Sequence, residues 1–202
     1  MIQSKADFRF YLCEDRKSNL GVSKINILKY IAMCVYSTDH VMAYRLIKSL
    51  RRYEYALNCL RNHGLIGRVQ YLYWKWWHRR MTVKYNIRLR VNSIGYGLRI
   101  PHMVGGGIIL GPAKMGNYCT ANSGVVVGLN RNEENRPVIG DHVELNVGCK
   151  VIGKIKIGSN VVVAANSLVY KDVPSNCVML GVPATVKREL PARSEGQLPH
   201  KW

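Results

Sequence analysis

The most regular pattern in the chain is an aliphatic residue at every sixth position. Six such positions follow one another in the second half of the chain: Ile139, Leu145, Val151, Ile157, Val163 and Val169. A small or β-branched residue stands four positions after each of them, and the same double register runs earlier from Ile109 to Val127. Neither a helix, with its period of 3.6, nor a half-buried strand, with its period of 2, repeats in this way. The pattern predicts a parallel β-helix, whose short strands stack coil upon coil around an apolar interior.

Before the repeats, apolar residues recur at three- and four-residue spacings. This spacing predicts helices over 26–34, 40–50 and 65–81, with Thr38 or Asp39 capping the second. The predicted fold class is therefore α+β, with a helical region over 1–92, a β-helix over 93–182 and a short tail over 183–202. The hexads break once, at the polar segment 129–136, which is expected to form an exposed excursion loop.

Positive charge is concentrated in the first half of the chain. Residues 1–100 contain 19 Lys and Arg against 5 Asp and Glu, whereas residues 101–202 contain 11 against 7. Interfacial aromatic residues between Tyr71 and Trp77 accompany this charge, which suits an anionic membrane surface. A helix that packs in an oligomer with solvated arginines is the alternative. Nucleic-acid binding is not expected, because no recognition motif accompanies the charge.

Cysteine spacing and the lack of long apolar runs bear on location. The six cysteines lie far apart, and Cys119 and Cys149 occupy the small-residue position of the repeat, where they are expected to be buried. Neither a disulfide framework nor a metal site is expected, and no apolar run is long enough to cross a membrane. The expected location is cytoplasmic, or peripheral at the inner face of the membrane.

His102 is the candidate catalytic residue, at the start of the repeats and beside a glycine run. A histidine is the natural general base for removing a proton from an attacking hydroxyl. A structural or surface role is the alternative for such a histidine. His142 is expected to occupy a solvated coil position, and Ser123 and Ser167 are repeat residues without an evident base. Nucleophilic serine catalysis is therefore not expected.

Several segments, in a specific order and spacing, resemble the serine acetyltransferase family of hexapeptide-repeat acyltransferases. They are Gly97–His102, the hexads from Ile139, Ala165–Val169 and Gly181–Ala184. The helical section resembles the branch found in bacterial capsule and surface-polysaccharide gene clusters. The resemblance implies a left-handed β-helix, a homotrimer, and acetyl-CoA bound in a groove between neighbouring subunits.

The resemblance also implies roles for particular residues. His102 matches the catalytic base. The implied cofactor-binding residues are Val147, Gly148, Ala165, Asn166, Gly181, Lys187 and Arg188. The last two are expected to meet the phosphates of the nucleotide end.

The chain departs from serine-acetylating members beside the base. Pro101 stands where they have an aspartate, and Asn135–Arg136 stands where they have an Arg-His pair. Glu133 or Glu134 is expected to orient His102, and Asn135 and Arg136 to contact the acceptor. The sequence therefore predicts an acetyl-CoA-dependent O-acetyltransferase acting on a sugar hydroxyl in surface-polysaccharide synthesis. The alternatives are a serine O-acetyltransferase and a non-catalytic hexapeptide-repeat scaffold; the intact His102 argues against the scaffold.

Overall fold

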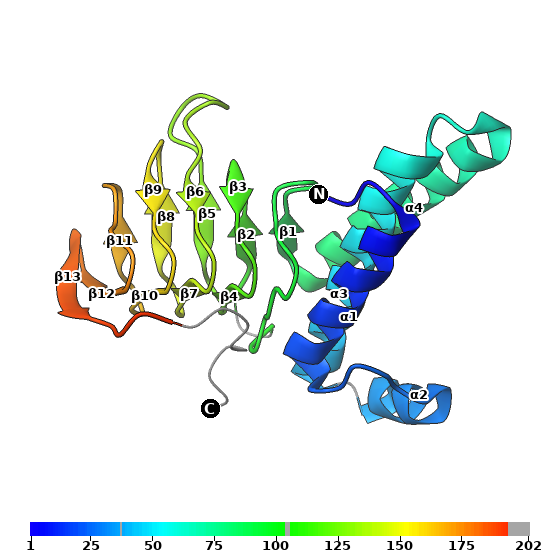
Figure 1. The fold of residues 1–202 in the computed structure, drawn as a ribbon, viewed down its shortest axis with the longest axis horizontal. Helices are drawn as coiled ribbons and strands as arrows, with labels where there is room; N and C mark the ends of the chain where they lie inside the picture. The colour runs from blue at the N-terminus through cyan, green and yellow to red at the C-terminus, as the bar shows by residue number, and fades with distance from the viewer. Residues whose placement is uncertain (37, 104–105, 194–202) are drawn as a thin grey trace.

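The computed structural model describes residues 1–36, 38–103 and 106–193. It has an N-terminal bundle of helices followed by a stack of coils made of short parallel strands (Figure 1). The predicted α+β architecture is confirmed. None of the helices in the described residues is long and apolar enough to span a lipid bilayer.

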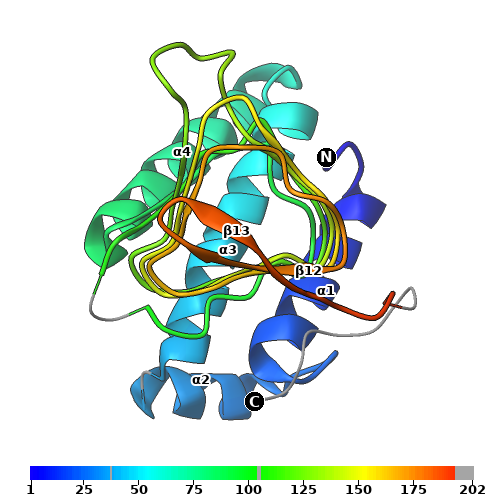
Figure 2. The same cartoon turned by 90° about the vertical axis from the view of Figure 1, so that its left-hand side faces the viewer.

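Three strand faces form the sides of a triangular β-helix, seen end-on in Figure 2. The first face consists of β1 (Ile87–Leu89), β2 (Ile108–Leu110), β5 (Val126–Gly128), β8 (Lys150–Ile152) and β11 (Leu168–Val169). The second face consists of β3 (Lys114–Met115), β6 (Val138–Ile139) and β9 (Lys156–Ile157). The third face consists of β4 (Thr120–Ala121), β7 (Glu144–Leu145), β10 (Val161–Val163) and β12 (Cys177–Gly181), with β13 (Ala184–Glu189) pairing antiparallel at its edge.

The hexads account for this triangle. Each hexad supplies one strand and one corner, so that Lys150 pairs with Leu168 three hexads later. The aliphatic position of every hexad points inward: the six residues from Ile139 to Val169 are each at most 3% exposed. The coils begin at β1, inside the range expected to be helical, because Ile87 and Leu89 alternate with an exposed Arg88 and pair with β2.

The N-terminal bundle contains one helix more than the apolar spacing predicts. Its members are α1 (Lys5–Leu20), α2 (Ile27–Tyr36), α3 (Asp39–Tyr55), a π-helical turn (Ala56–Leu60) and α4 (Gly64–Tyr85). In α1 the buried residues are Glu14, Asp15 and Asn19, which are polar, and so an apolar periodicity does not reveal it. Its ends are nevertheless well defined: the Ser4 side chain accepts a hydrogen bond from the Asp7 N–H, and Gly21 adopts a left-handed φ of 69°.

A buried charged cluster joins the bundle to the first coil. Arg51 in α3 is fully buried and donates to Asp15 (2.8 Å) and Glu54 (2.9 Å). It also donates to the carbonyl oxygens of Ile94 (2.9 Å) and Gly95. Burial alone disfavours the charged guanidinium, but the two carboxylates outweigh this and raise the pKa of Arg51. The cluster therefore fixes α1 and α3 against the base of the β-helix.

His78 in α4 makes folding stability depend on pH. It is 5% exposed, and its Nδ1 lies 2.9 Å from the Ser49 Oγ. Burial lowers its pKa from 6.5 to about 4. The stabilisation that comes from keeping His78 neutral is therefore fully present above pH 6.5, the pKa of the unfolded chain. It falls by roughly 3 kcal/mol in all as the pH drops from 6.5 to about 4, because only the unfolded chain takes up the proton in that interval.

Urea unfolding near neutral pH and at acid pH tests this expectation. His78→Gln should flatten the dependence through this interval, whereas His63→Gln, an exposed histidine before α4, should leave it as in the wild type. An unaltered pH dependence in His78→Gln would show that another group is responsible.

Candidate active site at one corner of the β-helix

His102 lies where the third face turns into the first. It follows Arg99, which bridges Thr120 on the third face, and it precedes β2 on the first face. Its neighbours Ile100 and Met103 are buried, whereas the imidazole of His102 is exposed. The base predicted from the sequence is therefore exposed to solvent at one corner of the first coil, the coil nearest the helical bundle. We call this corner the His102 corner.

Later coils continue the His102 corner through three turns, 122–125, 146–149 and 164–167. The Ser123 hydroxyl donates to the Gly106 carbonyl (3.2 Å), which links the 122–125 turn to the coil of His102. The Gly148 N–H donates to the Ser123 carbonyl and the Asn166 N–H to the Val147 carbonyl, each at 2.9 Å. Four of the residues expected to bind the cofactor, at 147, 148, 165 and 166, therefore lie along the same corner as His102.

The second residue of each turn presents an unused donor. The backbone N–H groups of Val147 and Ala165 have no hydrogen-bond partner among the described residues, and both residues are exposed. Gly148 and Asn166 follow them with left-handed φ values of 71° and 57°. A Cβ atom on Gly148 would lie 2.3 Å from the Asn166 Oδ1, so a side chain here would have to displace that amide as well as adopt a left-handed φ. The corner offers a ladder of N–H donors to an extended ligand.

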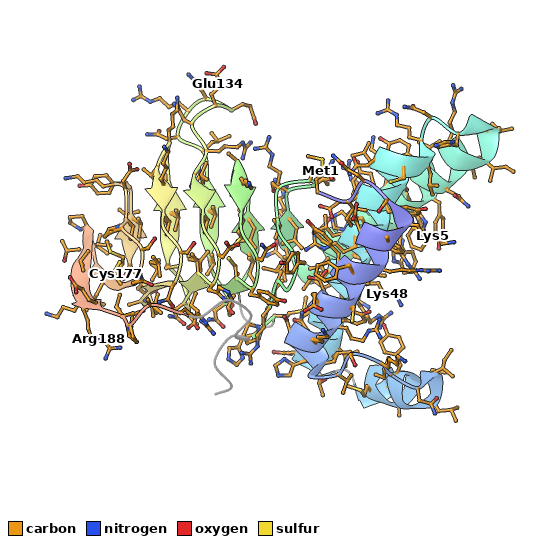
Figure 3. All side chains as sticks on the ribbon, viewed as in Figure 1. Met1, Lys5, Lys48, Glu134, Cys177 and Arg188 are labelled. Carbon is orange, nitrogen blue, oxygen red and sulfur yellow. The ribbon has the colours of Figure 1, made fainter. Side chains whose placement is uncertain are left out.

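The last coil brings Gly181 to the end of this corner farthest from the helical bundle, and the other two expected cofactor residues follow on the strand that leaves it. The Gly181 N–H donates to the Ser167 Oγ (3.1 Å), which ties the β12–β13 hairpin to the 164–167 turn. Lys187 and Arg188 follow in β13, and both are exposed. Their cations are therefore available to an anionic group at the end of the stack, where Figure 3 labels Arg188.

The excursion loop projects from a different corner. It connects β5 on the first face to β6 on the second face and extends away from the coils (Figures 2 and 3). Arg136 within it donates to the Gly111 carbonyl (2.8 Å) and to Glu133 (2.6 Å), and the guanidinium lowers the pKa of that carboxyl. Glu134 and Asn135 lie on the same loop, and Glu134 is exposed. Within one chain, these expected acceptor-binding or base-orienting residues do not meet His102.

A carboxylate expected only as a possible helix cap contacts the backbone of the residue that follows the base. Asp39 is the first residue of α3, and its Oδ2 accepts a hydrogen bond from the Met103 N–H (3.4 Å). Thr38 is the N-cap residue, but its side chain makes no capping hydrogen bond. Since Met103 adjoins His102, the helical bundle places one acidic side chain next to the first coil of the corner.

Other polar residues of the coils have structural roles. The Ser167 hydroxyl is buried and accepts from Gly181, so it is not a nucleophile. Cys119 and Cys149 are buried as expected, and burial raises the pKa of both thiols to about 12. His142 is not a solvated residue: it is half-buried and stacks on Tyr118 with ring centroids 5.3 Å apart. The physical reason is its left-handed φ of 54°, which turns it onto the ring one coil below.

Comparison with known proteins relates part of the chain to one group of enzymes. No family model matches the chain. A serine acetyltransferase from Synechococcus elongatus is 38% identical over 96 residues, which make up 46% of this chain and 38% of that protein. The chain thus matches less than half the length of that relative.

Two solved structures share the fold over nearly the whole chain. Neisseria gonorrhoeae serine acetyltransferase in complex with serine superimposes with a TM-score of 0.60 at 24% identity, over 92% of this chain and 71% of that one. Brucella abortus serine acetyltransferase in complex with coenzyme A superimposes with a TM-score of 0.64 at 18% identity, over 94% and 71%.

Proposed function

We propose that this chain, a relative of the serine acetyltransferases in repeat sequence and in fold, transfers an acetyl group from acetyl-CoA to a hydroxyl group. The observation that carries the proposal is the position of His102 on the same corner as the free N–H donors of Val147 and Ala165. A base and a ladder of donors for an extended thioester are the two things that this reaction needs.

The His102 corner fits acetyl-CoA. The N–H groups of Val147 and Ala165 are suited to the amide carbonyls of the pantetheine arm, and Gly148 leaves room for close approach. Lys187 and Arg188, at the far end of the stack, are suited to the phosphates. In the homotrimer that we infer for this protein, the exposed corner would be covered by the neighbouring subunit, which would form the second wall of the groove.

His102 is assigned the proton transfers. Its neutral imidazole accepts the proton of the acceptor hydroxyl while the oxygen of that hydroxyl attacks the thioester carbonyl carbon. As the carbon–sulfur bond breaks, the same imidazole returns its proton to the departing thiolate of coenzyme A.

L-serine is the acceptor that the comparisons favour over a sugar. The named relatives are serine acetyltransferases, and the Asp39 carboxylate, which accepts a hydrogen bond from Met103 next to the base, is suited to a serine ammonium group. A saccharide hydroxyl is the second candidate. Two features favour it: Pro101 stands beside the base, and Arg136, which was expected to contact the acceptor, is already bonded to Glu133 and Gly111. Both acceptors use the same chemistry at His102.

Competition between acceptors distinguishes the two. Purified protein is incubated with isotopically labelled acetyl-CoA and a mixture of L-serine and envelope saccharides, and the labelled products are identified by mass spectrometry. Labelled O-acetylserine supports the serine acceptor, whereas label confined to saccharides supports the second candidate. Label in neither product would contradict the transferase proposal.

Asp39→Asn should lower kcat/KM for the acceptor by about 10- to 100-fold, because it removes a charged hydrogen-bonding group beside the base. The KM for acetyl-CoA should be unchanged, since Asp39 lies away from the donor ladder. Steady-state kinetics with each substrate varied in turn measures both constants. Glu134→Gln is the companion variant: a loss there, with Asp39→Asn unaffected, would assign the orienting carboxylate to the excursion loop of a neighbouring subunit.

A further inference from the structure

The outer face of α4 exposes a large apolar surface to solvent. Its exposed apolar residues, each at least 48% exposed, are Leu65, Ile66, Val69, Leu72, Tyr73, Trp76 and Val83. At the helical angle per residue, Leu65, Leu72, Trp76 and Val83 fall within a sector of about 40°. Gly67, His78 and Met81, on the opposite side of the helix, are buried against the bundle. The apolar stripe therefore has no partner within the described chain.

Cations border this stripe on both sides. Arg68, Lys75 and Arg79 follow one edge and Arg80 and Lys84 the other, all five are exposed, and α4 contains no Asp or Glu. None of the ion pairs formed by the described residues involves α4. The Arg80 guanidinium lies 5.8 Å from the Trp76 ring centroid. Both residues line a hollow of about 480 Å³, together with Arg79, Val83 and Lys84. Apolar and cationic groups thus share one surface.

We propose that the outer face of α4 docks on the surface of a bilayer containing anionic lipids. A helix that lies in the interface places an apolar stripe at the acyl boundary, while flanking Lys and Arg contact lipid phosphates and Trp and Tyr lie at headgroup depth. α2 carries a second set of exposed apolar residues: Ile27, Leu28, Ile31 and Val35 are each at least 53% exposed. Both α2 and the first turns of α4 lie at the end of the molecule away from the coils (Figure 1).

Charge favours a bilayer over a second copy of this chain. Pairing two α4 faces would set five cations against five without one acidic residue, and like charges brought together oppose association. An anionic leaflet attracts each of these cations and also accepts the apolar stripe. The docking does not depend on the acetyltransfer proposed above.

Co-sedimentation of the full chain with vesicles tests the proposal. The protein should pellet with phosphatidylcholine vesicles that contain phosphatidylglycerol and remain in solution with phosphatidylcholine alone. Lys75→Glu/Lys84→Glu should weaken binding by at least about 30-fold, since each lysine at an anionic surface contributes about 1 kcal/mol. The matched control is Lys154→Glu/Lys171→Glu, which makes the same charge change on exposed residues of the coils and should change binding less than about threefold.

The apolar stripe is tested separately by Leu72→Ser/Trp76→Ser, which should also lose binding to the anionic vesicles. Three results would overturn the proposal: equal binding to anionic and neutral vesicles, equal losses of binding in the two lysine double variants, or unchanged binding in Leu72→Ser/Trp76→Ser. If the wild type does not bind vesicles, and analytical ultracentrifugation shows that it forms a larger assembly than Leu72→Ser/Trp76→Ser, then α4 is instead an interface between copies of this chain.

Discussion

Replacing His102 with alanine should lower kcat by about 10²- to 10⁴-fold, the usual contribution of a positioned general base. The imidazole is exposed, so the fold should be unaffected. The binding of acetyl-CoA should also persist, because Val147 and Ala165 present their donors on later coils. Steady-state kinetics gives the first quantity and calorimetric titration with coenzyme A the second.

The control for this variant is His142→Ala, which removes a histidine from another corner of the stack. It should lose the Tyr118 stacking and some stability but keep turnover within a few fold. Equal turnover in His102→Ala and the wild type would contradict the assignment of the base and would favour the non-catalytic scaffold.

Replacing Arg51 with methionine should destabilise the protein by about 3–5 kcal/mol. Methionine fills a similar volume but leaves the buried carboxylates of Asp15 and Glu54 without their cation, and the carbonyl groups of Ile94 and Gly95 without a donor. The loss should appear as a lower urea midpoint, measured with a probe for the helices and one for the coils.

Arg52→Met is the matched control because Arg52 is the neighbouring residue, is only half-buried, and stacks over Trp74 at 4.5 Å. Its loss should cost about 0.5–1 kcal/mol. Similar midpoints for the two variants would show that the cluster does not join the bundle to the coils.

The β-helix was predictable because each hexad carries its own signal. The aliphatic residue at every sixth position from Ile139 to Val169 is buried, and the polar segment 129–136 does leave the stack. Helix α1 was missed because its buried side consists of Glu14, Asp15 and Asn19. The signals that mark it are its caps, Ser4 followed by Asp7 at the start and Gly21 at the end.

The part of the candidate site that the coil turns supply was predictable from the sequence, and the part that the helical bundle supplies was not. Residues 147–148 and 165–166 are 18 positions, or three hexads, apart, so periodicity brings them to one edge. His102 lies 45 positions before Val147, outside this register, and only the family resemblance assigned it to the site. Asp39 reaches the same edge through the packing of the bundle on the first coil, which no local pattern encodes. The polysaccharide acceptor expected from the sequence is not supported by the comparisons, whose named relatives are serine acetyltransferases.

Release of free thiol from acetyl-CoA by the purified protein tests the central claim most directly. The account predicts release that depends on an added hydroxyl acceptor, saturates with L-serine or with a saccharide, and is lost in His102→Ala. Release that is absent with every acceptor, or that is the same in His102→Ala, would contradict it.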